Sequence, residues 1–144
     1  MKVIELIKQK SFEKALQILN DVGLNDIKDH IIEAAYESDD VVFCEFYDFL
    51  LTEVSPDSAD YYYAAAELYT TVFNYLPEGY SKAFKFSKKA IELNPSNVSL
   101  KEFILLFYSL PDQLLNKELA VKYAKDVIEQ DKENKAAKLI LENA

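Results

Sequence analysis

The sequence predicts an all-α protein, a single domain over residues 1–144 in which about nine helices form stacked antiparallel hairpins. The chain has only two Gly and four Pro among 144 residues, too few turn-forming residues for a sandwich, a barrel or an α/β fold. Apolar residues recur at helical spacing along the chain, with short connections between the periodic segments. Short connections make consecutive helices antiparallel neighbours.

The first part of the chain predicts two irregular hairpins over residues 1–54. The four expected helices span residues 2–9, 11–22, 25–36 and 38–54. Gly23 ends the second helix and Asn25 can cap the third. The fourth helix is apolar almost all round, so we expect it to lie in the centre of the fold.

The second part of the chain predicts five more helices. Ser55, Pro56 and Asp57 are typical of a helix start, with a capping hydroxyl followed by Pro in the first turn. The expected helices span residues 55–75, 79–93, 97–109, 116–130 and 133–143.

The chain also contains an internal repeat. The segment Phe73–Glu78 aligns with Phe107–Asp112 at an offset of 34 residues, and the helices that follow, 83–92 and 120–129, align at an offset of 37. A period in this range is typical of stacked helical repeats.

At its best-preserved copy the repeat resembles the tetratricopeptide repeat (TPR) family. Tyr80, Ala83, Ala90 and Pro95 fit the family's spacing of an aromatic residue, two small residues and a helix-ending proline. The resemblance implies an α-solenoid with TPR-like repeats over about 58–131 and a C-terminal capping helix over about 133–143.

Negative charge is concentrated near the N-terminus. The net charge is −9, and all 16 basic residues are lysines, so direct binding to nucleic acid is not expected. Between Asp21 and Glu53 there are ten acidic residues and one lysine, Lys28. Five carboxylates of the third helix share one side and are called the acidic stripe here: Asp26, Asp29, Glu33, Glu37 and Asp40.

No catalytic constellation is present, so we expect no enzymatic activity, no cofactor and no metal. Cys44, the only cysteine, lies in an apolar run and predicts a buried, inert thiol. His30 has Asp26 and Glu33 at helical spacing, but one histidine with surface carboxylates is a weak metal site beside the reading of an exposed helical histidine. No glycine-rich loop could hold a phosphate.

Two functional hypotheses remain, both of them protein binding. In the first, the acidic stripe binds and neutralises a basic protein, with Glu45, Asp48 and Tyr62 as neighbouring contacts. Small, acidic, non-enzymatic bacterial proteins of this kind resemble the immunity proteins that act as antitoxins against nuclease toxins. The same charges would also suit a merely solubilising face.

In the second hypothesis, the TPR resemblance implies an adaptor that holds an extended peptide in a concave groove. The groove residues would be Glu67, Thr71, Asn74, Lys101, Leu105 and Tyr108.

Among the consecutive tyrosines Tyr61, Tyr62 and Tyr63, at least one is expected to be exposed, because three successive positions cannot all face inward. The chain shows no signal peptide and no long apolar run, so we expect a cytoplasmic, monomeric protein that does not contact membranes.

Overall fold

The computed structural model describes all 144 residues and contains only helices and the turns between them. The α-helices are α1 (Lys2–Lys8), α2 (Phe12–Val22), α3 (Lys28–Ser38), α4 (Val42–Phe49), α5 (Ala59–Thr71), α6 (Gly79–Leu93), α7 (Val98–Ile104), α8 (Leu106–Ser109), α9 (Lys117–Gln130) and α10 (Lys135–Glu142). The prediction of an all-α fold with about nine helices is confirmed, since α7 and α8 are one predicted helix that is interrupted at Leu105.

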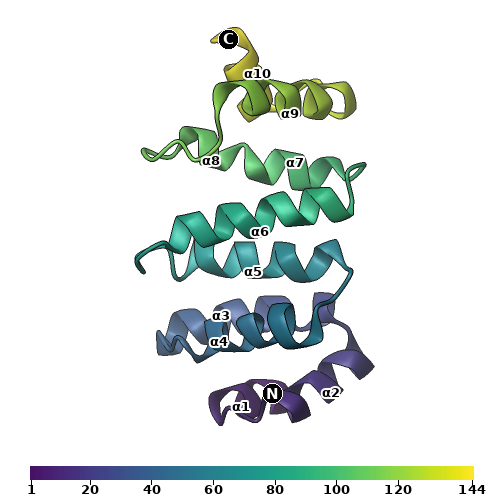
Figure 1. Ribbon diagram of the computed structural model, residues 1–144, viewed down its shortest axis with the longest axis vertical. Coiled ribbons are helices and arrows are strands. Elements are labelled where there is room, and N and C mark those ends of the chain that lie inside the picture. Colours follow the sequence, from purple (N-terminus) through teal and green to yellow (C-terminus); the bar gives the residue numbers. More distant parts are fainter.

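The helices follow one another along the long axis of the molecule, from α1 and α2 at one end to α9 and α10 at the other (Figure 1). Helix α5 packs along α6, α6 contacts α7, and α9 packs on both α7 and α10. The N-terminal helices are joined to this arrangement through α4, which contacts both α1 and α5, and through α3, which also contacts α5. The two ends of the chain therefore lie far apart.

One apolar core runs through the whole arrangement, with 34 buried residues in a single cluster. Helix α4 is as central as its sequence predicts, because Phe43, Phe46 and Tyr47 are all fully buried. Ala83 and Ala90, the small residues of the repeat pattern, are also fully buried. Small side chains at these positions let neighbouring helices approach closely.

Several helix starts differ from the predicted ones. Asn25 lies in a 3₁₀ turn, Leu24–Asp26, and α3 begins only at Lys28. The predicted start of α4 at residue 38 is wrong because α3 continues to Ser38 and ends on Asp39, which adopts the left-handed conformation. The side chain of Asp40 then accepts a hydrogen bond from the Val42 N–H group at 2.9 Å.

The connection between α4 and α5 also differs. Helix α4 passes into a π-helical segment, Leu50–Val54, which ends where Ser55 adopts a left-handed conformation. Helix α5 begins after Ser58, whose hydroxyl accepts a hydrogen bond from the Asp60 N–H group. Pro56 therefore lies in the connecting loop rather than in the first helical turn, because Ser58, and not Ser55, caps the helix.

Gly79, the first residue of α6, is in close contact with the turn that precedes it. It is buried, and a Cβ atom there would lie 2.5 Å from the backbone oxygen of Phe73 and 3.2 Å from the Cα of Asn74. Both neighbours are backbone atoms, so a larger side chain would have to push the turn and α6 apart.

We therefore predict that Gly79→Ala lowers the free energy of unfolding by about 2 kcal/mol, the usual cost of overpacking. Urea denaturation followed by circular dichroism would measure the change. Ser81→Ala, at an exposed position of the same helix, should change stability by less than about 0.5 kcal/mol. Equal stability of the two variants would contradict the close contact.

Tyr47 carries the one buried polar side-chain atom without a hydrogen-bond partner. Its ring is fully buried in α4, and its hydroxyl has no donor or acceptor within hydrogen-bonding distance. An unsatisfied buried hydroxyl costs free energy that a hydrogen bond would otherwise offset.

Removing this hydroxyl by Tyr47→Phe should therefore leave stability unchanged or raise the free energy of unfolding by up to about 1 kcal/mol. Thermal unfolding would detect the effect, with Tyr47→Ala as the comparison, which should lose about 3 kcal/mol or more through the cavity it creates. A loss of stability in Tyr47→Phe would mean that the hydroxyl is hydrogen-bonded in solution.

Candidate functional site

The acidic stripe remains exposed, although only part of it lies on one helix. Asp29, Glu33 and Glu37 succeed one another at four-residue spacing on α3. Asp26 precedes α3 in the 3₁₀ turn, and Asp40 follows its left-handed end. The expectation that one helix carries all five carboxylates is therefore wrong, because that helix begins later and ends in a tight turn, but all five side chains are exposed.

The negative charge of this region is almost entirely free of ion pairs. Among the ten acidic residues between Asp21 and Glu53, only Glu45 forms an ion pair, with Lys10 at 3.4 Å. Lys28, the one basic residue of the segment, pairs with none of these carboxylates but with Glu67 of α5 at 3.2 Å. The field of the acidic stripe is thus not cancelled within the protein.

Two exposed tyrosines accompany the carboxylates. Tyr36 on α3 is 77% exposed, and Tyr75 in the turn between α5 and α6 is 58% exposed. The Tyr75 hydroxyl donates a hydrogen bond of 2.6 Å to Asp39, which joins this turn to the end of α3. That hydrogen bond raises the pKa of the Tyr75 hydroxyl above its ordinary value.

We call these groups together the acidic surface, made up of Asp29, Glu33, Tyr36, Glu37, Asp39, Asp40 and Tyr75. Sequence reasoning missed both tyrosines. Tyr36 could have been found, since its position on α3 is only about 20° from that of Asp29 around the helix axis. Tyr75 could not, because it is brought to Asp39 by tertiary packing across 36 residues.

The three predicted neighbours of the acidic stripe are engaged elsewhere. Glu45 pairs with Lys10, as described above. Asp48 is half-buried near Lys82 of α6. Tyr62 is half-buried against Phe86, with ring centroids 6.4 Å apart.

The tyrosines 61–63 also differ from the expectation, because none of the three is exposed. All are half-buried. Their side chains contact neighbouring helices, as in the edge-to-face pair of Tyr63 and Phe103, at 5.1 Å between ring centroids. Interhelical packing on both sides of α5 thus covers positions that an isolated helix would leave open.

The predicted peptide groove has its charged groups already paired. Glu67 pairs with Lys28, and Lys101 pairs with Asp126 of α9 at 2.9 Å. Leu105 is only 1% exposed.

The uncharged polar residues of the groove are either hydrogen-bonded within the fold or only partly exposed to solvent. Asn74 and Thr71 each donate a hydrogen bond to a carbonyl one turn earlier in the chain. Tyr108 is half-buried. The groove thus presents few uncommitted polar groups.

Cys44 and Asp48 form a small polar cluster where α4 meets α5 and α6. Burial raises the pKa of the Cys44 thiol to about 11, so the thiol is protonated at neutral pH and is a poor nucleophile. The buried thiol predicted from the sequence is confirmed. The ammonium group of Lys82 lies beside this cluster, 5.5 Å from the centroid of the Tyr69 ring.

His30 is exposed, as are Asp26 and Glu33. No group of three His, Cys, Asp or Glu side chains is arranged to hold a metal ion. None of the helices combines the length and the apolar character that crossing a bilayer requires.

Comparisons with protein families and with curated proteins give no relative. No protein-family model matches the chain, and a search of the curated proteins finds no match either. The candidate site therefore has to be interpreted from its own residues.

Asp48 allows a prediction about pH. Burial is the main cause that raises the pKa of its carboxyl group above the ordinary value. An acid whose pKa is higher in the folded state destabilises the fold once it is ionised, so its cost is absent at low pH and grows as the pH rises through the folded-state pKa.

Asp48→Asn should therefore raise the free energy of unfolding at pH 7, by less than about 1 kcal/mol because the group is partly solvated. The gain should vanish below the unfolded pKa of about 3.9. Urea titrations at several pH values would show it, and Asp57→Asn, at an exposed position, should show no such pH dependence. A constant difference across the pH range would contradict this account.

Proposed function

We propose that this protein is a non-enzymatic binding module whose acidic surface docks a basic protein. The observation that carries the proposal is the set of exposed carboxylates on and beside α3 that no lysine of the chain neutralises. A field of this kind attracts a cationic partner over distances of about one Debye length and orients it before contact.

The two tyrosines give the acidic surface an apolar component. Tyrosine contributes a large, rigid contact area and is frequent among the residues that dominate binding energy. Tyr75 is held in place by its hydrogen bond to Asp39, so little conformational freedom is lost when a partner covers it. The carboxylates would orient the basic partner, and Tyr36 and Tyr75 would provide contact area.

The partner class that suits this surface is a basic nuclease-like toxin domain, which the protein would neutralise as an immunity protein. A nuclease needs a positively charged groove for the phosphate backbone. An acidic surface that covers such a groove competes directly with nucleic acid, and no catalysis is required of the inhibitor.

The alternative is a peptide-binding adaptor of the TPR type, and one observation favours it. A hollow of about 510 Å³ lies between α5, α7, α8 and α10, with Tyr63, Phe103 and Leu106 among its lining residues. An extended peptide could place an apolar side chain there. We rank this function second, because Glu67 and Lys101 already form ion pairs within the fold.

The experiment is affinity capture of binding proteins on the immobilised chain at about 50 and 300 mM salt, which spans strong and weak screening. The variant Asp29→Lys/Glu33→Lys/Glu37→Lys should lose the basic partner that the natural chain retains at low salt. With the purified partner, the affinity should fall by at least about tenfold, and the natural chain but not the variant should inhibit its nuclease activity.

The matched control is Asp112→Lys/Glu118→Lys/Glu129→Lys, which makes the same charge change at exposed acidic positions away from α3. This control should keep most of the affinity. If both triple variants bind the partner as well as the natural chain does, the acidic surface is not the docking site. Loss of binding in Leu106→Ala instead would move the site to the hollow beside α7 and α8.

A further inference from the structure

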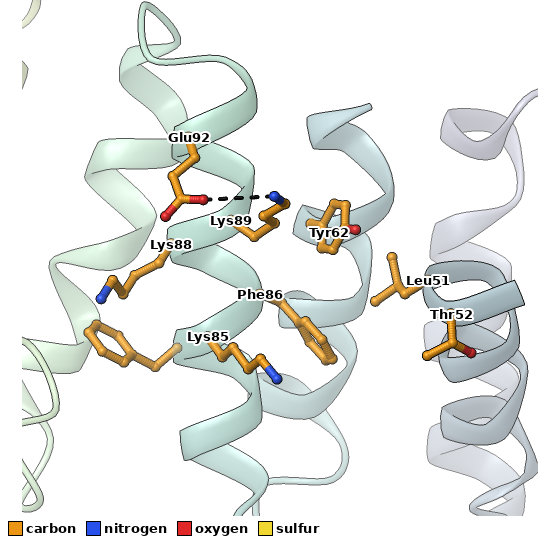
Figure 2. Close-up of a pocket in the computed structure, with 9 residues that line it drawn as sticks. Leu51, Thr52, Tyr62, Lys85, Phe86, Lys88, Lys89 and Glu92 are labelled. Carbon is orange, nitrogen blue, oxygen red and sulfur yellow. Dashed lines mark ion pairs between the residues drawn. The ribbon is translucent and has the colours of Figure 1, made fainter. Parts of the chain in front are cut away.

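A second hollow, of about 530 Å³, lies where the end of α4 faces α5 and α6 (Figure 2). The π-helical segment contributes Leu51 and Thr52, α5 contributes Tyr62, and α6 contributes most of the remaining lining. Its volume falls in the range of about 300–1,000 Å³ that is usual for small-molecule sites. It is separate from the acidic surface described above.

Lysines surround this hollow. Lys85, Lys88 and Lys89 of α6 line it together with a single acidic residue, Glu92. Helix α6 contains four lysines and one glutamate, a charge of +3, in a protein whose net charge is −9. The hollow is thus a local cationic site on an otherwise acidic molecule.

The charges of these lysines are hardly committed within the fold. Lys85 forms no ion pair, and Lys89 meets Glu92 only at 3.9 Å with both side chains well exposed. The ammonium group of Lys88 lies 5.5 Å from the centroid of the Phe84 ring. Such contacts cost little to rearrange when an anion arrives.

The inside of the hollow is apolar. Phe86 and Tyr62 form a tilted aromatic pair and Leu51 faces them across the gap, as Figure 2 shows. The wall that carries Leu51 is the π-helical segment, a type of distortion that is frequent at functional sites. A ligand would therefore meet apolar side chains inside and ammonium groups around the opening.

We propose that this hollow binds a small amphipathic anion, a molecule with an aliphatic or aromatic body and one carboxylate head group. The body would pack on Leu51, Tyr62 and Phe86, and the carboxylate would be held by Lys85 and Lys89. Charge complementarity selects the anion, because Lys85 forms no ion pair and Lys89 forms only a long, exposed contact with Glu92. The limited volume selects a small molecule over a folded partner.

The same reasoning excludes a nucleic acid as the occupant. A nucleic acid would have to approach many carboxylates outside α6, and these repel phosphates. A small anion needs only the local field of the lysines. The proposal is independent of the acidic surface, so either can fail without the other.

The test uses sodium decanoate as the probe and follows backbone amide resonances of the full chain by NMR. We expect saturable shifts centred on Leu51, Tyr62 and Phe86, with a dissociation constant near or below about 1 mM, as ligand size suggests. Lys85→Gln/Lys89→Gln should weaken binding by about fivefold or more. Both lysines are exposed, and a circular dichroism melt would verify that the variant is folded.

Two controls make the outcome decisive. Lys122→Gln/Lys125→Gln removes the same charge from exposed positions of α9 and should bind decanoate as the natural chain does. Decyltrimethylammonium, with the opposite head group, should not shift the same amides. Unchanged decanoate affinity in the Lys85/Lys89 variant, or equal binding of the cationic probe, would overturn the proposal. The proposal would also be overturned if the chain self-associated through Lys85 and Lys89 and did not bind decanoate.

Discussion

The close packing of α5 against α6 is the contact on which both candidate surfaces depend. Close packing of helices favours small residues, and Ala65 of α5 and Ala83 and Ala90 of α6 are fully buried. The absence of a side chain at Gly79, the first residue of α6, lets the backbone of Phe73 and Asn74 in the preceding turn come close to this helix. This turn brings Tyr75 to Asp39, and the same packing sets the lysines of α6 opposite the end of α4. A wider spacing of the pair would separate both sets of residues.

The fold keeps opposite charges apart instead of pairing them. The segment between Asp21 and Glu53 carries a charge of −9, and Glu45, paired with Lys10, is the only one of its ten acidic residues in an ion pair. The lysines of α6 make one long contact, with Glu92. Pairing these two groups with each other would gain little, because exposed ion pairs contribute at most about 1 kcal/mol. Keeping them separate leaves an uneven electric field, which can orient a charged partner as it approaches.

Helical periodicity was sufficient to predict the fold class and most helices, because the buried faces of α2, α6 and α9 alternate regularly with exposed residues. Two of the errors in the helix starts lie where a single residue takes a left-handed conformation. Asp39 and Ser55 do so without being glycine, and each moves a helix start by several positions. The acidic stripe was visible in the sequence, whereas the contact of Tyr75 with Asp39 and the hollow beside α6 depend on packing between distant segments.

The state of each charge in the unbound protein distinguishes the two protein-binding proposals. A partner that binds in the predicted groove must break or bypass the ion pairs of Lys101 with Asp126 and of Lys28 with Glu67, both partly buried. Breaking a partly buried pair leaves one charge without its partner, which costs more than the pair contributes. The carboxylates of α3 have no such pairs to lose and are exposed to solvent. A cationic partner at the acidic surface therefore adds new charge interactions without removing any that already stabilise the fold.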